Sequence, residues 1–109
     1  MSKQQIIENT DEFTFEFKHL ELDKPVNWHQ ANTLCDELGN EWRLPTKREL
    51  ELLYIELHQK GKGNFNLKYY WSKTETSSMR VWALHFGYSI EDFGYHKNNS
   101  AYVCAVRTL

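Results

Sequence analysis

The fold of this chain is decided by Trp42-Arg43-Leu44-Pro45-Thr46-Lys47-Arg48-Glu49-Leu50. Pro45 lacks a backbone N–H and disfavours a helical conformation at Leu44, so no helix runs through this point. Thr46 and Glu49 have the spacing of a capping box, in which each side chain accepts a hydrogen bond from a backbone N–H at the start of a helix. The stretch therefore predicts a helix that begins directly after Pro45.

Two helices are predicted, one on each side of this stretch. Asn27 and Gln30 have the spacing of a second capping box, which opens a helix over residues 28–38. Apolar residues at helical spacing form one face of this helix, and Cys35 belongs to that face, so we place it in the core. The same spacing predicts a second helix over residues 47 to 58 or 59.

Elsewhere the apolar residues follow the two-residue period of strands. Phe13, Phe15 and Phe17 alternate with polar residues and predict a strand that extends to Leu22, with one buried face. Further strands are predicted over residues 70–72, 80–86, 91 to 95 or 96, and 101–107. Short polar turns between these four strands indicate an antiparallel meander. The fold class is therefore α+β, with two helices on one side of a mainly antiparallel, twisted sheet.

The size and charge of the chain limit what it can be. Its 109 residues suit a single domain, which we place at residues 12–109, after a polar and flexible lead-in over residues 1–11. The formal net charge of -2 provides no overall positive field, so we expect neither a nucleic acid nor an anionic membrane as partner. The oligomeric state is left open.

The sequence also bears on location and redox state. No apolar run is long enough to cross a bilayer, and the first residues lack the apolar segment of a signal peptide, so we expect a cytoplasmic protein and leave export by another route open. Cys35 and Cys104 are the two cysteines, and in a reducing compartment both are expected to be thiols.

In the order and spacing of its motifs, the chain resembles the DUF1566 family, also known as the Legionella collagen-like protein C-terminal domain, which has a C-type-lectin-like fold. The matching positions are Trp28, Ala31, Cys35, Leu38, the block Trp42 to Leu50, Phe65, Tyr70-Trp71-Ser72, Trp82, Phe86, Gly87, Lys97 to Ser100 and Val106-Arg107. They span about residues 26–107. The resemblance implies that the first and last strands lie together, that two helices brace the sheet, and that the ligand-facing surface lies between the Trp71-Ser72 strand and the last strand.

The chain departs from the family pattern in two places. Many members carry a second cysteine directly before the closing Val-Arg, where it meets the cysteine of the first helix; here that position is Ala105, and Cys104 comes one residue earlier. Because strand side chains alternate between faces, this offset turns the thiol away and argues against a Cys35–Cys104 disulfide. The secretion signal of many relatives is also missing.

Most of the conspicuous side chains suit a structural role better than a binding role. Three of the four tryptophans fall on regular helix or strand spacing, so the tryptophans are expected in the core rather than on a stacking platform for sugars or bases. Arg43 and Arg107 are expected to pair with acidic groups or carbonyls near the sheet ends, with their stems on aromatic surface. The expected structural residues are Trp28, Cys35, Trp42, Arg43, Pro45, Thr46, Glu49, Trp71, Trp82 and Arg107.

No catalytic or metal motif stands out, so we predict no cofactor, no metal and no enzymatic activity. His85 and His96 could meet on adjacent strands, yet the five histidines lack metal-ligand spacing. Calcium ligands are available at Glu91, Asp92 and residues 98–99, but the tripeptides that true C-type lectins use for sugar are absent. The alternative is a small metal- or thiol-dependent enzyme related to the formylglycine-generating fold, using these histidines and a cysteine.

The segment 87–96 holds more large side chains than a short meander can bury entirely, so they either contact a partner or half of them simply cover the sheet. Such aromatic and polar surfaces suit contact with a partner. The expected ligand-binding residues are Tyr88, Ile90, Glu91, Asp92, Phe93, Tyr95 and His96. The sequence therefore predicts a non-catalytic binding or display module that contacts a protein or glycan partner through this segment, with residues 75–80 as a further candidate contact.

Overall fold

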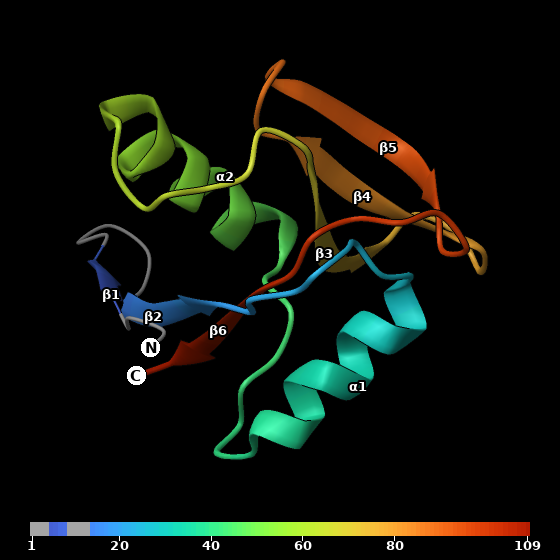
Figure 1. Ribbon diagram of the computed structural model, residues 1–109, viewed down its shortest axis with the longest axis horizontal. Helices are drawn as coiled ribbons and strands as arrows, with labels where there is room; N and C mark the ends of the chain where they lie inside the picture. Colours follow the sequence, from blue (N-terminus) through green and yellow to red (C-terminus); the bar gives the residue numbers. More distant parts are fainter. Residues whose placement is uncertain (1–4, 9–13) are drawn as a thin grey trace.

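The computed structural model describes residues 5–8 and 14–109, with side-chain surroundings from residue 15 onward. Within these residues the strands form two three-stranded antiparallel sheets, ordered β1-β2-β6 and β3-β4-β5 (Figure 1). In chain order the elements are β1 (Gln5–Glu8), β2 (Thr14–His19), α1 (Trp28–Leu38), α2 (Lys47–Glu56), the 3-10 helix η1 (His58–Lys60), β3 (Tyr69–Glu75), β4 (Arg80–His85), β5 (Ile90–His96) and β6 (Cys104–Thr108). The predicted α+β class is confirmed.

Both predicted helix starts are confirmed by their capping boxes. The Asn27 side chain accepts a hydrogen bond from the backbone N–H of Gln30 at 2.8 Å, and the Asn27 N–H donates to Gln30 Oε1 at 3.0 Å. Thr46 and Glu49 make the same reciprocal pair at the start of α2, at 3.2 and 2.8 Å. These bonds satisfy backbone groups that the first helical turn leaves unpaired.

The second helix ends earlier than predicted. It stops at Glu56, and η1 follows before Gly61 takes a left-handed conformation with φ of 72°. The side chain of His58 hydrogen-bonds through Nε2 to the carbonyl of Phe86 at 2.9 Å. The 3-10 helix η1 therefore contacts the β4–β5 turn, which is distant in sequence. Local spacing does not reveal this contact.

The predicted meander is correct for three strands and wrong for the fourth. β3, β4 and β5 are consecutive antiparallel neighbours, whereas β6 pairs with β2 from the opposite end of the chain. The segment before β6 makes isolated bridges, Val26 with Ala101 and Tyr70 with Tyr102. The chain therefore passes the edge of β3 and leaves that sheet. As the family resemblance implies, the first predicted strand and the last one lie together.

The N-terminal region holds a strand that the sequence did not predict. Gln5–Glu8 form β1, paired antiparallel with β2, inside the segment predicted as a flexible lead-in. The remainder of that lead-in, and Phe13 of the predicted first strand, lie outside the described residues. The predicted strand itself is shorter than expected at its far end, since β2 stops at His19.

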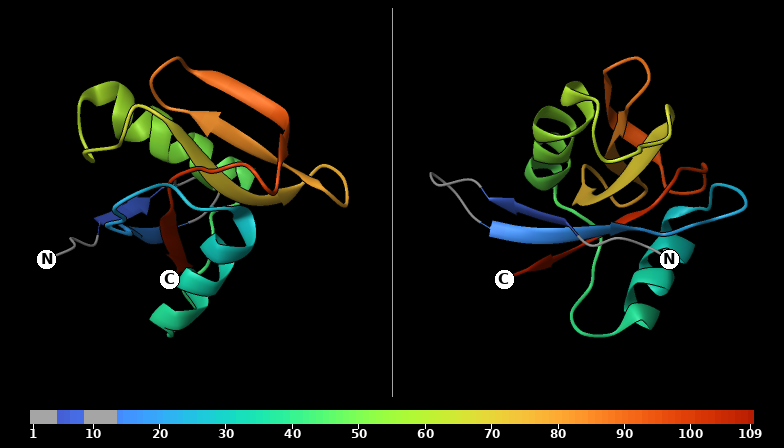
Figure 2. Two further views of the ribbon diagram at one scale, coloured as in Figure 1. Left: turned by 45° about the vertical axis from the view of Figure 1, so that its right-hand side comes forward. Right: turned by 60° about the vertical axis from the view of Figure 1, so that its left-hand side comes forward.

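The core consists of two clusters, one on each side of β6. Cys104 and Val106 belong to the cluster that also contains the buried leucines of α2, whereas Ala105 belongs to the cluster that contains Ala31 and Cys35 of α1. Figures 1 and 2 show α1 and α2 on opposite sides of this strand. The alternation of strand side chains thus assigns successive β6 residues to different helices.

Candidate functional site

The segment singled out by the sequence, residues 87–96, forms the turn after β4 and the strand β5 of the β4–β5 hairpin. Its turn is held from within, because Nδ1 of His85 accepts hydrogen bonds from the backbone N–H groups of Gly87 and Tyr88, both at 3.1 Å. A Cβ atom at Gly87 would lie 2.8 Å from the carbonyl oxygen of Leu67, so the turn needs glycine there. Ser89 follows with a positive φ of 57° and contacts the hydroxyl of Tyr54. The hairpin tip is therefore fixed against the 66–68 loop and α2.

Four of the seven predicted binding residues are exposed. Tyr88 is 75% exposed, Phe93 62% and Ile90 48%, and Glu91 is exposed as well. The ring of Tyr88 stacks on the imidazole of His85, with ring centroids 4.7 Å apart and planes inclined by 22°. This contact holds the Tyr88 ring against the turn and leaves its outer face open to solvent.

The other three predicted residues are half-buried and have internal partners. The hydroxyl of Tyr95 donates to the carbonyl of Ser100 at 2.7 Å, and Nδ1 of His96 accepts from the backbone N–H of Asn98 at 3.0 Å. Oδ1 of Asp92 accepts a hydrogen bond from the backbone N–H of Gly94, also in β5. Tyr95 and His96 therefore shape the turn that leads to β6.

An aromatic row crosses the face of the β3-β4-β5 sheet away from α2. The rings of Tyr69 and Tyr95 meet with centroids 4.4 Å apart, and Tyr69 contacts His85 edge-on at 4.8 Å. Burial, followed by nearby negative charge that includes Asp92, raises the pKa of both tyrosines, so both stay neutral at physiological pH. A hollow of about 300 Å³ adjoins this row. It is lined by Pro25, Lys68, Tyr69, His85, Tyr95, Ser100, Ala101 and Tyr102.

A smaller hollow of about 220 Å³ lies on the other face of the hairpin, against α2. Ile55 of α2 and Glu91 of β5 both line it, and Ile55 is 44% exposed. Leu67, 60% exposed, adjoins the turn at Gly87. Ile55, Leu67 and Tyr69 could not be assigned to this site from sequence because they come from other elements. The alternation of Tyr69 with Trp71 is the one local signal for the tyrosine.

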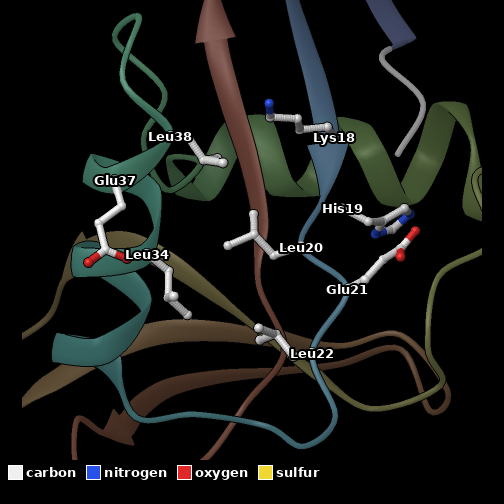
Figure 3. Close-up of a pocket in the computed structure, with 8 residues that line it drawn as sticks. All are labelled: Lys18, His19, Leu20, Glu21, Leu22, Leu34, Glu37 and Leu38. Carbon is white, nitrogen blue, oxygen red and sulfur yellow. The ribbon is translucent and has the colours of Figure 1, made fainter. Parts of the chain in front are cut away.

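A third hollow, of about 370 Å³, lies between α1 and the segment after β2. Figure 3 shows Leu20 and Leu22 pointing toward Leu34 and Leu38 of the helix. All four leucines are half-buried. This groove could not be predicted from sequence, because its two walls come from separate elements.

The expected structural residues lie in the interior or in paired positions. Trp42, Trp71 and Trp82 are buried, and Trp28 is half-buried with its Nε1 donating to the carbonyl of Ser72 at 2.9 Å. Pro45 is buried just before α2. These placements leave no stacking platform among the tryptophans.

Both arginines have acidic partners, as the sequence suggested. Arg43 forms a two-pronged ion pair with Glu49, with N–O distances of 2.6 and 2.9 Å. Arg107 pairs with Glu16, and its guanidinium lies 4.9 Å from the ring centre of Trp42. The arginines are therefore used to join elements.

The suggested meeting of His85 with His96 is wrong. His85 lies opposite Ile90 and His96 opposite Arg80, so they sit at opposite ends of the hairpin, about 16 Å apart at the usual rise per strand residue. The described residues contain no group of three or more His, Cys, Asp or Glu side chains placed to hold a metal ion. The alternative hypothesis of a metal- or thiol-dependent enzyme relied on His85 and His96 meeting, and this structure does not bring them together.

The cysteines are free and buried. Burial, and then the charge of Asp36, raises the pKa of Cys35 to about 12. Burial also raises the pKa of Cys104 well above its ordinary value, with a smaller contribution from Cys35. A thiolate is the reactive form of cysteine, so neither side chain is prepared for nucleophilic chemistry.

The chain is thus a compact α+β domain with two helices and small antiparallel sheets, a hairpin exposed on one side and no evident metal or catalytic cluster among its described residues. The family model of the Lcl C-terminal domain, formerly DUF1566, matches residues 5–107. The chain belongs to this family. No curated protein matches it. Within the described part of the chain, neither helix has the length and apolar character needed to span a membrane.

Proposed function

We propose that this domain is a non-catalytic binding or display module of C-type-lectin-like fold, which contacts a protein or glycan partner through the β4–β5 hairpin, residues 87–96. The observation that carries the proposal is the clustering of exposed apolar side chains. Tyr88, Ile90 and Phe93 lie within six residues of one another, and Ile55 and Leu67 adjoin the same hairpin. These side chains lie on both faces of one hairpin, and such a concentration of exposed apolar surface is typical of interaction sites.

The geometry of the hairpin supports this role. Its turn is held by His85, its base by Tyr95, and a hollow lies on each of its faces. A surface that is already ordered loses less conformational entropy on binding. A chemical role is disfavoured by the raised pKa of both thiols and by the separation of His85 from His96.

A double substitution tests the proposal. Tyr88→Ala with Phe93→Ala removes two exposed side chains, so we expect the free energy of unfolding to change by less than about 1 kcal/mol. Immobilised wild-type and variant domains are compared for capture from a lysate of the native host and for binding to a glycan array. A protein or glycan held by the wild type and lost by the variant supports the proposal.

Leu109→Ala is the matched control, because this residue is also large, apolar and exposed but lies outside residues 75–80 and outside the hairpin. The control variant should bind like the wild type. Equal capture by all three proteins, or an unfolded Tyr88/Phe93 variant, would overturn the proposal. Tyr95 is kept in every variant because its ring packs on Tyr69.

A further inference from the structure

β5 is an edge strand whose outer side is open. It is the last strand in the order β3-β4-β5, and Figures 1 and 2 show it at the margin of the molecule. Apart from a bond within the turn that follows it, no described residue outside β4 makes a backbone hydrogen bond to β5. Such an edge presents backbone N–H and C=O groups that can pair with another strand.

Two other sheet edges are covered by the chain itself. At β3, the backbone N–H of Trp71 donates to the carbonyl of Tyr102 at 3.1 Å, and the backbone N–H of Tyr102 donates to the carbonyl of Tyr69 at 2.8 Å. At β6, Arg43 and Val106 exchange backbone hydrogen bonds of 3.0 and 2.8 Å. Connecting segments cover these two edges, whereas no segment within residues 5–8 and 14–109 covers the outer edge of β5 in this way.

Only part of the β5 edge is available. The strand bulges opposite β4, and at the bulge the N–H of Gly94 donates to Oδ1 of Asp92 at 2.9 Å. The carbonyl of Gly94 accepts from Nη1 of Arg80 at 2.6 Å. Since both backbone groups of Gly94 are occupied, the open edge is residues 90–93, about 13 Å of strand.

The side chains of this open edge have a definite pattern. It reads apolar, acidic, acidic, apolar, from Ile90 through Glu91 and Asp92 to Phe93. Neither carboxylate forms an ion pair with any residue in the described ranges. A strand laid antiparallel along the edge would place basic residues opposite the two acids and apolar residues opposite Ile90 and Phe93.

We propose that the 90–93 edge of β5 docks an extended segment of a partner protein with the pattern apolar-basic-basic-apolar. A second copy of this chain fits poorly, because full antiparallel overlap of two such edges places Glu91 of each copy opposite Asp92 of the other, and like charges in that position repel. A glycan lacks the repeating N–H and C=O groups that an edge strand pairs with. The inference rests on the proposed function and names the class of its partner.

The probe is the peptide acetyl-Thr-Val-Lys-Arg-Val-Thr-amide, titrated into ¹⁵N-labelled protein at low salt. We expect amide shifts concentrated at residues 90–93 and slower hydrogen exchange there. A peptide with Glu-Glu in place of Lys-Arg should bind about tenfold more weakly, because two attractive cross-strand pairs become repulsive. Glu91→Lys should reduce or reverse the preference for the Lys-Arg peptide over the Glu-Glu peptide. Glu21→Lys, which changes an exposed charge beside α1, should leave that preference unchanged.

Three results would overturn the inference: no shifts at residues 90–93, a peptide preference that Glu91→Lys leaves unchanged, or sedimentation showing that the free protein dimerises through β5. The proposed function is tested by a separate experiment. If the peptide does not bind but the Tyr88/Phe93 variant loses a glycan, the hairpin remains a binding site and only the strand-docking inference is wrong.

Discussion

The ion pair between Arg43 and Glu49 joins three parts of the fold. Glu49 lies in the first turn of α2, where its Oε1 also accepts a hydrogen bond from the backbone N–H of Thr46 at 2.8 Å. Nη2 of Arg43 reaches Oγ1 of Thr108 on β6 at 2.8 Å. Glu49 is 5% exposed, so its charge depends on these partners rather than on water. The helix start and the last strand are therefore linked through this ion pair.

The pKa of Glu49 shows that this link favours the charged form. Burial alone would raise that pKa, but hydrogen bonds from Arg43 and Thr46 outweigh it and lower the pKa below its ordinary value. A group with a lowered folded pKa adds stability that is present above its unfolded pKa, about 4.3. That stability is lost as the pH falls through the lowered, folded value.

We predict that Glu49→Gln lowers the free energy of unfolding by about 2 kcal/mol at pH 7, because it leaves the Arg43 guanidinium partly buried without its charged partner. Because wild type loses this contribution in acid, the difference between the two proteins should shrink below pH 4. Urea unfolding at pH 7 and at pH 3 measures both. Glu51→Gln is the control, since Glu51 makes only a partly exposed pair with Lys47 at 3.3 Å. If Glu49→Gln and wild type differ in free energy of unfolding by the same amount at pH 7 and pH 3, the charge of Glu49 is not the source of this stability.

At the residue scale, the sequence predicts what depends on near neighbours. The capping boxes of Asn27 and Thr46 involve residues three positions apart, so their spacing is sufficient to find them. The pairing of Arg107 with Glu16 joins residues 91 positions apart. The charge of arginine predicted the kind of partner for Arg107, but only the fold identifies the residue.

At the scale of elements, β6 divides the core. Its alternating side chains place Cys104 with Phe15 and Phe17, and Ala105 with Cys35. This is the arrangement that the one-residue offset in the family pattern suggested. Both natural thiols are free, and they belong to different clusters. The position that shares a cluster with the helix cysteine is the one occupied by alanine.

We therefore predict that Ala105→Cys forms a disulfide with Cys35 when the protein is refolded in a glutathione redox buffer. Closing a loop of about 70 residues should stabilise the fold by about 2–4 kcal/mol relative to the reduced variant. Peptide mapping by mass spectrometry identifies the linked pair, and thiol titration in denaturant should leave one free cysteine, Cys104. Wild type treated in the same way should keep two free thiols; a Cys35–Cys104 link in wild type would contradict the assignment of faces.

The element-scale predictions from sequence succeed where a pattern is local. The helix starts and the strands of the β3–β5 meander follow from period and turn composition. The pairing of β6 with β2 does not, because a two-residue period shows that a segment is a strand without showing its neighbour. The same limit applies to the candidate site, whose hairpin could be predicted while Ile55 and Leu67 beside it could not.

At the scale of the whole molecule, the two ends of the chain complete one sheet. β6 pairs with β2 on one side and bridges Arg43 on the other, although these partners are separated from it by most of the sequence. Contacts of such long range close large loops, and the entropy of loop closure must be overcome before these contacts stabilise the fold. The core on both sides of β6 is therefore complete only when the last residues are in place.

We predict that deletion of residues 105–109 abolishes cooperative folding. The deletion removes Ala105 and Val106, which are both fully buried in different clusters, and it leaves the edge of β2 unpaired. The free energy lost with the contacts that both core clusters make to β6 should exceed the stability of a typical domain, about 5–15 kcal/mol. Near-ultraviolet circular dichroism of the buried tryptophans and thermal unfolding provide the readout. Deletion of Leu109 alone, which is 60% exposed, should leave both signals unchanged. A truncated protein with a cooperative transition close to that of wild type would show that β6 is dispensable and that the two clusters can close without it.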